Sequence, residues 1–102
     1  MKEISLANKS YYVNPQGFLV NHKRWDDDFA RQMASEIGIE SGLTKKHWEV
    51  IHFLREYFDK NGVVPTVYEC CEANQLELED CERLFPDGYH RGALKIAGLR
   101  VR

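Results

Sequence analysis

The stretch that decides the fold lies in the middle of the chain, where residues 44–62 read TKKHWEVIHFLREYFDKNG. Thr44 can cap the amino end of a helix, and Gly62 can end one. Between these two residues, apolar side chains recur at helical spacing: Trp48, Ile51, Leu54, Tyr57 and Phe58. This is the longest and most apolar periodic segment of the chain, so we predict that it forms the central helix, ending at about Lys60.

Two elements are predicted before the central helix. In residues 11–20, β-prone triplets flank Asn14-Pro15-Gln16-Gly17, a type I turn composition, which predicts a β-hairpin. The triplet Asp26-Asp27-Asp28 can then begin a helix, because acidic side chains satisfy and neutralise its amino end. We favour this role over a metal loop, since the ligand spacing of a calcium loop is absent. The apolar face of this helix comprises Trp25, Phe29, Ala30, Met33, Ala34 and Ile37, and Gly38 can close it.

Shorter elements are predicted after the central helix. Residues 66–73 and 77–84 are compatible with two short helices separated by Asn74-Gln75, which is the outline of a helix-turn-helix. A turn at Phe85-Pro86-Asp87-Gly88 then leads into a last helix ending at about Ala97. We therefore expect one domain over residues 1–102, with a hairpin at about 11–20, a helical body at about 26–84 and a C-terminal helix and arm at 85–102.

The bulk composition narrows the class of protein. The chain has 102 residues, is 43% hydrophobic and 29% charged, and carries a formal net charge of -2. It has no apolar run long enough to span a bilayer, and residues 1–10 lack the apolar core of a signal peptide. The three cysteines cannot all pair with one another, which favours a reducing compartment. We therefore expect a cytoplasmic protein that does not bind membranes.

The helix-turn-helix outline raises the hypothesis of a DNA-binding regulator. However, the span from Glu69 to Glu82 contains six carboxylates and no lysine or arginine. These charges would be repelled by a phosphate backbone, which supplies much of the affinity in such complexes. We therefore expect this unit to serve packing, and we do not expect specific nucleic-acid binding.

Thiol chemistry is a second possibility, because Cys70, Cys71 and Cys81 lie close in sequence. The chain lacks the Cys-x-x-Cys pattern of redox pairs and zinc sites. Acidic neighbours raise the pKa of a thiol and lower the thiolate fraction, so we expect buried or unreactive thiols. His47 and His52 are five residues apart and do not share one helix face as metal ligands would. We predict no catalytic residue, no metal site and no cofactor.

Three stretches, taken together, carry a family resemblance across nearly the whole chain. They are Gly17-Phe18-Leu19, the run from His47 to Tyr57, and Leu84-Phe85-Pro86 with Gly88, Ala93, Lys95 and Ala97-Gly98-Leu99. The chain resembles the DsrC/TusE family of sulfur-relay proteins, historically called the gamma subunit of dissimilatory sulfite reductase. The resemblance implies a mainly α fold, namely a small orthogonal helical bundle with an N-terminal β-hairpin, a helix-turn-helix-like element and a mobile C-terminal arm.

The resemblance also implies an activity whose residues this sequence does not keep. Family members carry sulfur on a penultimate arm cysteine, for tRNA thiolation in one branch or for sulfite reductase in the other. The second branch has another arm cysteine, at the position held here by Leu94. After Leu99 the sequence given has only Arg100, Val101 and Arg102, and Tyr89 replaces a common proline.

These departures lead to three hypotheses. The first is a non-catalytic family member that acts by protein–protein contact in sulfur relay, dissimilatory sulfur metabolism or its regulation. Its partner would be a sulfite-reductase-like or sulfur-relay protein, bound through the basic residues Arg91, Lys95, Arg100 and Arg102. The second is an active sulfur carrier or sulfurtransferase using Cys70, Cys71 or Cys81, and the third is the helix-turn-helix regulator. Independently of the choice, Leu94, Ile96 and Leu99 can pack on the body, while the family branch and the oligomeric state stay open.

Overall fold

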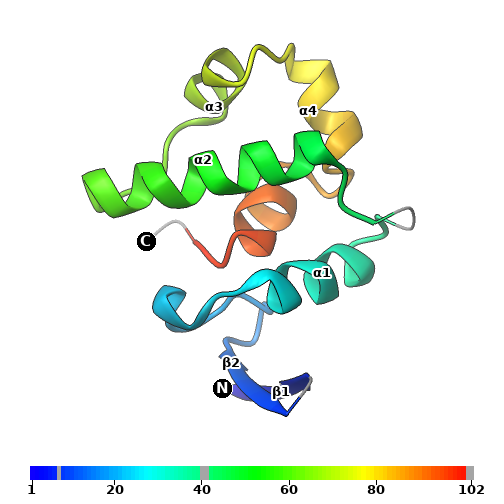
Figure 1. The fold of residues 1–102 in the computed structure, drawn as a ribbon, viewed down its shortest axis with the longest axis vertical. Coiled ribbons are helices and arrows are strands. Elements are labelled where there is room, and N and C mark those ends of the chain that lie inside the picture. Colours follow the sequence, from blue (N-terminus) through cyan, green and yellow to red (C-terminus); the bar gives the residue numbers. More distant parts are fainter. Residues whose placement is uncertain (7, 40–41, 101–102) are drawn as a thin grey trace.

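The computed structural model describes residues 1–6, 8–39 and 42–100, and its ribbon is drawn in Figure 1. It is mainly helical with an antiparallel N-terminal hairpin, as predicted. In chain order the elements are β1 (Lys2–Leu6), β2 (Lys9–Val13), the 3-10 turn η1 (His22–Arg24), α1 (Asp27–Glu36), α2 (Lys45–Asn61), α3 (Val67–Ala73), α4 (Leu78–Leu84) and the π-helix η2 (Tyr89–Leu94). Within the described residues, no helix is both long enough and apolar enough to cross a membrane.

The strands of the hairpin lie earlier in the chain than the predicted span of about 11–20. β1 and β2 pair antiparallel, with Lys2 opposite Val13 and Leu6 opposite Lys9. Asn8 supports the tight connection between the strands with a φ of 67°, a conformation that asparagine tolerates. The predicted turn is present, since the Gly17 N–H donates to the Asn14 carbonyl over 2.8 Å. Beyond that turn only an isolated bridge forms, between Val13 and Leu19, so residues 18–20 are not a regular strand.

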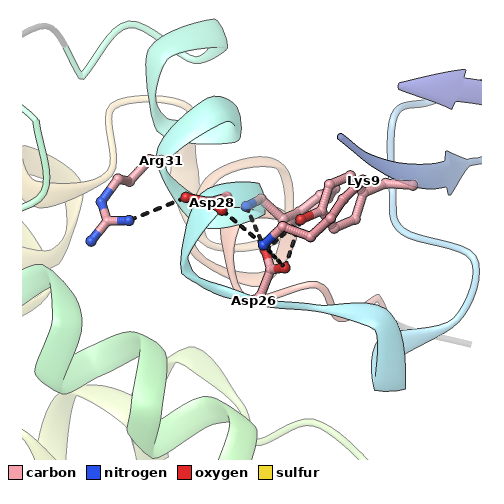
Figure 2. Close-up of polar contacts among 6 residues, drawn as sticks. Lys9, Asp26, Asp28 and Arg31 are labelled. Carbon is pink, nitrogen blue, oxygen red and sulfur yellow. Dashed lines mark hydrogen bonds and ion pairs between the residues drawn. The ribbon is translucent and has the colours of Figure 1, made fainter. Parts of the chain in front are cut away.

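The three aspartates begin α1, as predicted, and they also fasten the hairpin to it. The Asp26 side chain caps the helix by accepting a hydrogen bond from the Phe29 N–H over 3.0 Å. Lys9 on β2 donates to Asp26 over 2.9 Å and to Asp28 over 2.8 Å, as Figure 2 shows. Arg31, one turn further along α1, reaches Asp28 over 3.5 Å. The acidic triplet is therefore a helix cap and a hairpin anchor, whose contact with Lys9 no sequence pattern indicated.

The central helix α2 has the predicted ends, with Thr44 as its N-cap and Gly62 in the left-handed conformation as its C-cap. Its buried face is turned slightly from the predicted one. The deeply buried side chains are His47, Val50, Ile51 and Leu54, whereas Trp48, Tyr57 and Phe58 are only partly buried.

His47 explains this rotation of the buried face. Its Nδ1 accepts the Thr44 N–H over 3.0 Å, so the proton lies on Nε2, which donates to the Leu84 carbonyl over 2.7 Å. The ring also meets the Phe85 ring edge-on, with 5.2 Å between centroids. A buried imidazole with both nitrogens satisfied is a structural brace, in line with the ordinary role expected for it.

The two short helices follow the predicted limits closely. α3 is capped by Thr66, which exchanges hydrogen bonds with Glu69 in a capping box. Gln75 makes the intervening turn with a φ of 52°, and Glu77 caps α4. The last helix also lies where predicted, but its first part is the wider π-helix η2 rather than an α-helix. Gly92 sits inside it, and a Cβ there would come within 3.2 Å of the Phe85 Cβ.

The C-terminal helix lies in the middle of the molecule. Figure 1 shows η2 and the residues after it, in orange and red, between α1 and α2. Ala93, Leu94, Ile96 and Ala97 are fully buried, and Leu99 is 3% exposed. The end of the described chain is therefore part of the hydrophobic core rather than an appendage to it.

Candidate partner-binding site at the C-terminal segment

Residues 89–100, here called the C-terminal segment, are largely buried from Gly92 to Leu99, with Lys95 half-buried. Leu94 is fully buried, so its side chain has no contact with solvent. The expectation that Leu94, Ile96 and Leu99 pack on the body is confirmed. The mobile arm implied by the resemblance is not found within this segment, because burying these side chains stabilises the docked position by roughly 1.5–3 kcal/mol each.

Two side chains from the body hold the backbone of the C-terminal segment. The Trp25 indole N–H donates to the Ile96 carbonyl over 2.8 Å. The Arg55 guanidinium on α2 donates to the Ala97 carbonyl over 2.8 Å and to the His22 carbonyl over 3.0 Å. Arg55 also lies over the Trp25 ring, 4.4 Å from its centroid. These contacts satisfy carbonyls that the end of the last helix leaves without intrahelical partners.

Two glycines allow the close approach of the elements around the segment. Gly98 has a φ of 73°, and a Cβ there would lie 2.6 Å from the Trp25 Cδ1. Gly17 in the turn after β2 has a φ of 90°, and a Cβ there would lie 2.8 Å from the Lys95 ammonium nitrogen. Both positions favour glycine because of the left-handed backbone, and Gly98 also lacks the space for a side chain beside the Trp25 ring. The three stretches on which the resemblance depends thus meet at one place.

The structure places the predicted basic residues on different parts of the surface. Arg91 is exposed on η2, whereas Lys95 is half-buried with its ammonium group 5.4 Å from the centroid of the Phe18 ring. Lys95 and Asp87 both line one hollow. Arg100 lines a different hollow, beside Leu99. Arg102 lies outside the described residues. The assignment of these four residues to partner binding stays a prediction.

The three cysteines belong to the short helices α3 and α4, and all three are buried. Cys70 is fully buried, Cys71 is 7% exposed and Cys81 is 4% exposed, and none forms a disulfide. Burial, with the neighbouring thiols, raises the pKa of Cys70 from 9.0 to about 12. Burial and the Cys71 thiol raise the pKa of Cys81 from 9.0 to about 11. Thiols of this kind are protonated at neutral pH, so they are poor nucleophiles.

The outer surface of α3 and α4 is acidic. Five of the six carboxylates between Glu69 and Glu82 are exposed, and Asp80 is half-buried. Asp80 pairs with Arg83 over 3.1 Å. A surface of this charge does not suit a phosphate backbone, and the structure therefore gives no support to groove recognition by this unit. Among the described residues, no three His, Cys, Asp or Glu side chains form a group that could hold a metal ion.

The anchors Trp25 and Arg55 were missed as functional side chains by the sequence analysis. The sequence pattern places Trp25 on the apolar face of α1 and Arg55 within the central run of the resemblance. The one available signal was their type, since tryptophan and arginine carry donors that suit buried carbonyls. Their partners lie 71 and 42 residues away in sequence, a separation at which spacing carries no information.

Fold and site together define a small helical protein with an enclosed C-terminal segment and enclosed thiols. A family model described as "DsrC like protein" matches residues 5–101, and the chain belongs to that family. The gamma subunit of the dissimilatory-type sulfite reductase of Nitratidesulfovibrio vulgaris is 33% identical over 99 residues, covering 97% of this chain and 93% of the relative. A TusE sulfurtransferase homolog of Haemophilus influenzae is 33% identical over 94 residues, covering 85% of this chain and 84% of the relative.

Solved structures agree with this membership. The crystal structure of dissimilatory sulfite reductase I (DsrI) matches with a TM-score of 0.94 at 28% identity, over 99% of this chain and 96% of that one. The oxidized gamma subunit, DsrC, from Archaeoglobus fulgidus matches with a TM-score of 0.85 at 31% identity, over 99% of this chain and 96% of that one. These relatives are named for sulfite reductase and sulfur transfer, and the DNA-binding alternative finds no support among them.

Proposed function

We propose that this chain is a non-catalytic member of the DsrC family that acts by binding a protein of sulfur metabolism. The proposed partner is a sulfite-reductase-like enzyme or a sulfur-relay protein, in keeping with the names of the relatives. The chain would occupy or regulate the place of a sulfur carrier without carrying sulfur on the described residues.

The observation that carries this proposal is the state of Leu94. In the branch of the family that serves sulfite reductase, the resemblance puts a second arm cysteine at this position, and here the position holds a fully buried leucine. A hydrocarbon side chain offers no nucleophile, and its neighbours Ala93 and Ile96 are fully buried as well. At this position the segment therefore packs into the core and offers no group for sulfur chemistry.

The state of the thiols supports the same proposal against an active carrier. A persulfide forms when a thiolate attacks a sulfur donor, so it requires both access and ionisation. Cys70 and Cys81 lack both at neutral pH, with pKa values of about 12 and about 11. Cys71 is 7% exposed and lies beside Cys81. These features favour a structural role for the three thiols.

We further propose that residues 1–102 work as a single domain in the cytoplasm. Three unpaired thiols support a reducing compartment, because an oxidising one favours disulfides. The burial of the C-terminal segment between α1 and α2 supports a single folding unit.

A binding measurement tests the proposal. Purified dissimilatory sulfite reductase lacking its gamma subunit is titrated with the chain by isothermal calorimetry, and its sulfite reduction is assayed in parallel. We expect binding, and we expect the chain to reduce the stimulation given by an authentic gamma subunit. An absence of binding to this enzyme and to TusE partner proteins would contradict the proposal.

A further inference from the structure

A groove on the hairpin side of the molecule is not used by any contact described above. It has a volume of about 310 Å³ and lies between β2 and the chain that leads to η1. We call it the hairpin groove. Its lining includes Met1, Ser10, Tyr12, Val20, Asn21 and Arg24.

The hairpin groove exposes apolar side chains. Tyr12 is 48% exposed and Val20 is 38% exposed, although both belong to residue types that gain by burial. Met1 at its edge is 82% exposed. Because burial of apolar surface is favourable, a partner that covered these side chains would gain affinity. The apolar surface is small but lies in a concave site, where one partner segment could cover all of it.

Positive charge borders the apolar surface. Arg24 lines the hairpin groove itself, and the neighbouring Lys23 is exposed. A second hollow shares Leu19 and Val20 with the groove and is lined by Arg100 at the end of the C-terminal segment. Among the described residues, no aspartate or glutamate lines either hollow. The occupant must therefore combine apolar side chains with negative charge.

We propose that the hairpin groove docks an acidic, apolar segment of the partner protein. The apolar side chains of that segment cover Tyr12 and Val20, while its carboxylates pair with Arg24 and Arg100. Carboxylates suit these sites because the guanidinium group binds them through paired hydrogen bonds. The outer face of α3 and α4, which is acidic, has the wrong charge for the same occupant.

This inference rests on the proposed function, because it names the chemistry of the partner at a surface that adjoins the C-terminal segment. The buried anchors at Trp25 and Arg55 fix the end of that segment beside the second hollow. The position of Arg100 relative to the hairpin groove is thus set by the core and not by the partner. A preformed site of this kind keeps the entropic cost of binding low.

The first test uses two synthetic peptides, one alternating leucine with glutamate and the other alternating leucine with lysine. Each is titrated into the isotope-labelled chain, and amide chemical shifts are followed. We expect the acidic peptide to shift the amides of Tyr12, Val20, Arg24 and Arg100, and the basic peptide to leave them in place. Equal shifts with both peptides, shifts confined to α3 and α4, or no response to the acidic peptide would overturn the inference.

Matched variants sharpen this test. Val20→Glu and Arg24→Glu should each weaken the binding of the acidic peptide about tenfold, the size expected for a residue central to an interface. Leu78→Glu and Arg83→Glu on α4 are the controls, since Leu78 is 42% exposed and Arg83 is exposed too. The controls should leave the affinity unchanged, and equal losses in both sets would contradict the inference. All four positions are on the surface, and thermal unfolding checks that each variant is folded.

The same variants, titrated against sulfite reductase lacking its gamma subunit, separate the inference from the proposed function. If the enzyme binds the native chain and the two groove variants equally, the groove inference fails and the proposed function stands. If the enzyme binds no form of the chain while the acidic peptide behaves as expected, the named partner fails and the groove inference stands.

Discussion

The C-terminal segment and the α3–α4 unit differ in their thiols, because the C-terminal segment contains none and the α3–α4 unit contains three that are buried. In the C-terminal segment, Leu94 holds the position at which the resemblance implies a second arm cysteine in one branch of the family. In the α3–α4 unit three thiols are present, but all three are buried, and burial raises the pKa of Cys70 to about 12 and that of Cys81 to about 11. The comparison teaches that a cysteine count says little about reactivity, which depends on access and on the thiolate fraction.

The largest expected effect is on stability, where a substitution in the C-terminal segment should cost more than one in the α3–α4 unit. Leu94→Ala removes a fully buried side chain and should lower the free energy of unfolding by about 3 kcal/mol. Leu78→Ala on α4 is the matched control, because Leu78 is 42% exposed and should cost less than about 1 kcal/mol. Urea denaturation followed by circular dichroism measures both. Similar losses in the two variants would show that the C-terminal segment is not the enclosed element described above.

The anchor of the C-terminal segment gives the next effect. Arg55→Ala removes hydrogen bonds to the Ala97 and His22 carbonyls and should cost about 2 kcal/mol. Hydrogen exchange should accelerate at the amides of residues 95–99. Arg83→Ala, which breaks an exposed ion pair with Asp80, should cost less than about 1 kcal/mol and leave that exchange unchanged. Unchanged exchange in the Arg55 variant would mean that packing alone holds the segment.

The buried thiols predict a loss of stability at alkaline pH. The unfolded thiols ionise near pH 9.0, while those of folded Cys81 and Cys70 ionise near pH 11 and pH 12. Above pH 9.0 the unfolded chain therefore binds fewer protons, and each thiol lowers the free energy of unfolding by up to about 1.4 kcal/mol per pH unit. Denaturation between pH 7 and pH 11 measures the slope. The double variant Cys70→Ala, Cys81→Ala should show a shallower fall, and an identical slope would contradict the raised pKa values.

The smallest effect concerns local opening of the thiol cluster. Thr66→Ala removes the N-cap of α3 and should cost about 1 kcal/mol. If α3 opens locally, labelling of the thiols by Ellman's reagent should become about fivefold faster. Thr44→Ala removes the equivalent cap from α2 at a similar cost. Equal acceleration in the two variants would show that the thiols are exposed by global unfolding instead.

Features set by local sequence were predictable. Thr44, Thr66, Asp26 and Gly62 define helix ends through interactions within four residues, so their roles follow from side-chain chemistry. The predicted position of the hairpin was too late in the chain, because residues 2–6 give only a weak strand signal. Their apolar side chains that pack on the core are Ile4 and Leu6. The π-helical geometry of η2 was not predictable, since no residue pattern in 89–94 distinguishes it from an α-helix.

The candidate site was only partly predictable for the same reason. The basic residues of the C-terminal segment were visible in the sequence, but their distribution over separate hollows depends on tertiary packing. The anchoring contacts of Trp25 and Arg55 join residues far apart in the chain. The hairpin groove combines β2 with the segment before η1, and no periodicity links these two stretches.

The central claim is that the native chain does not carry sulfur on its described residues, and intact-mass spectrometry tests it most directly. The folded chain is incubated with an inorganic polysulfide at pH 7, and its intact mass is then measured. The variant Arg91→Cys, which places an exposed thiol on η2, is the positive control. We expect the control to gain the mass of one sulfur atom and the native chain to gain none. A gain of one sulfur atom by the native chain, mapped to Cys70, Cys71 or Cys81, would contradict the claim and restore an active carrier.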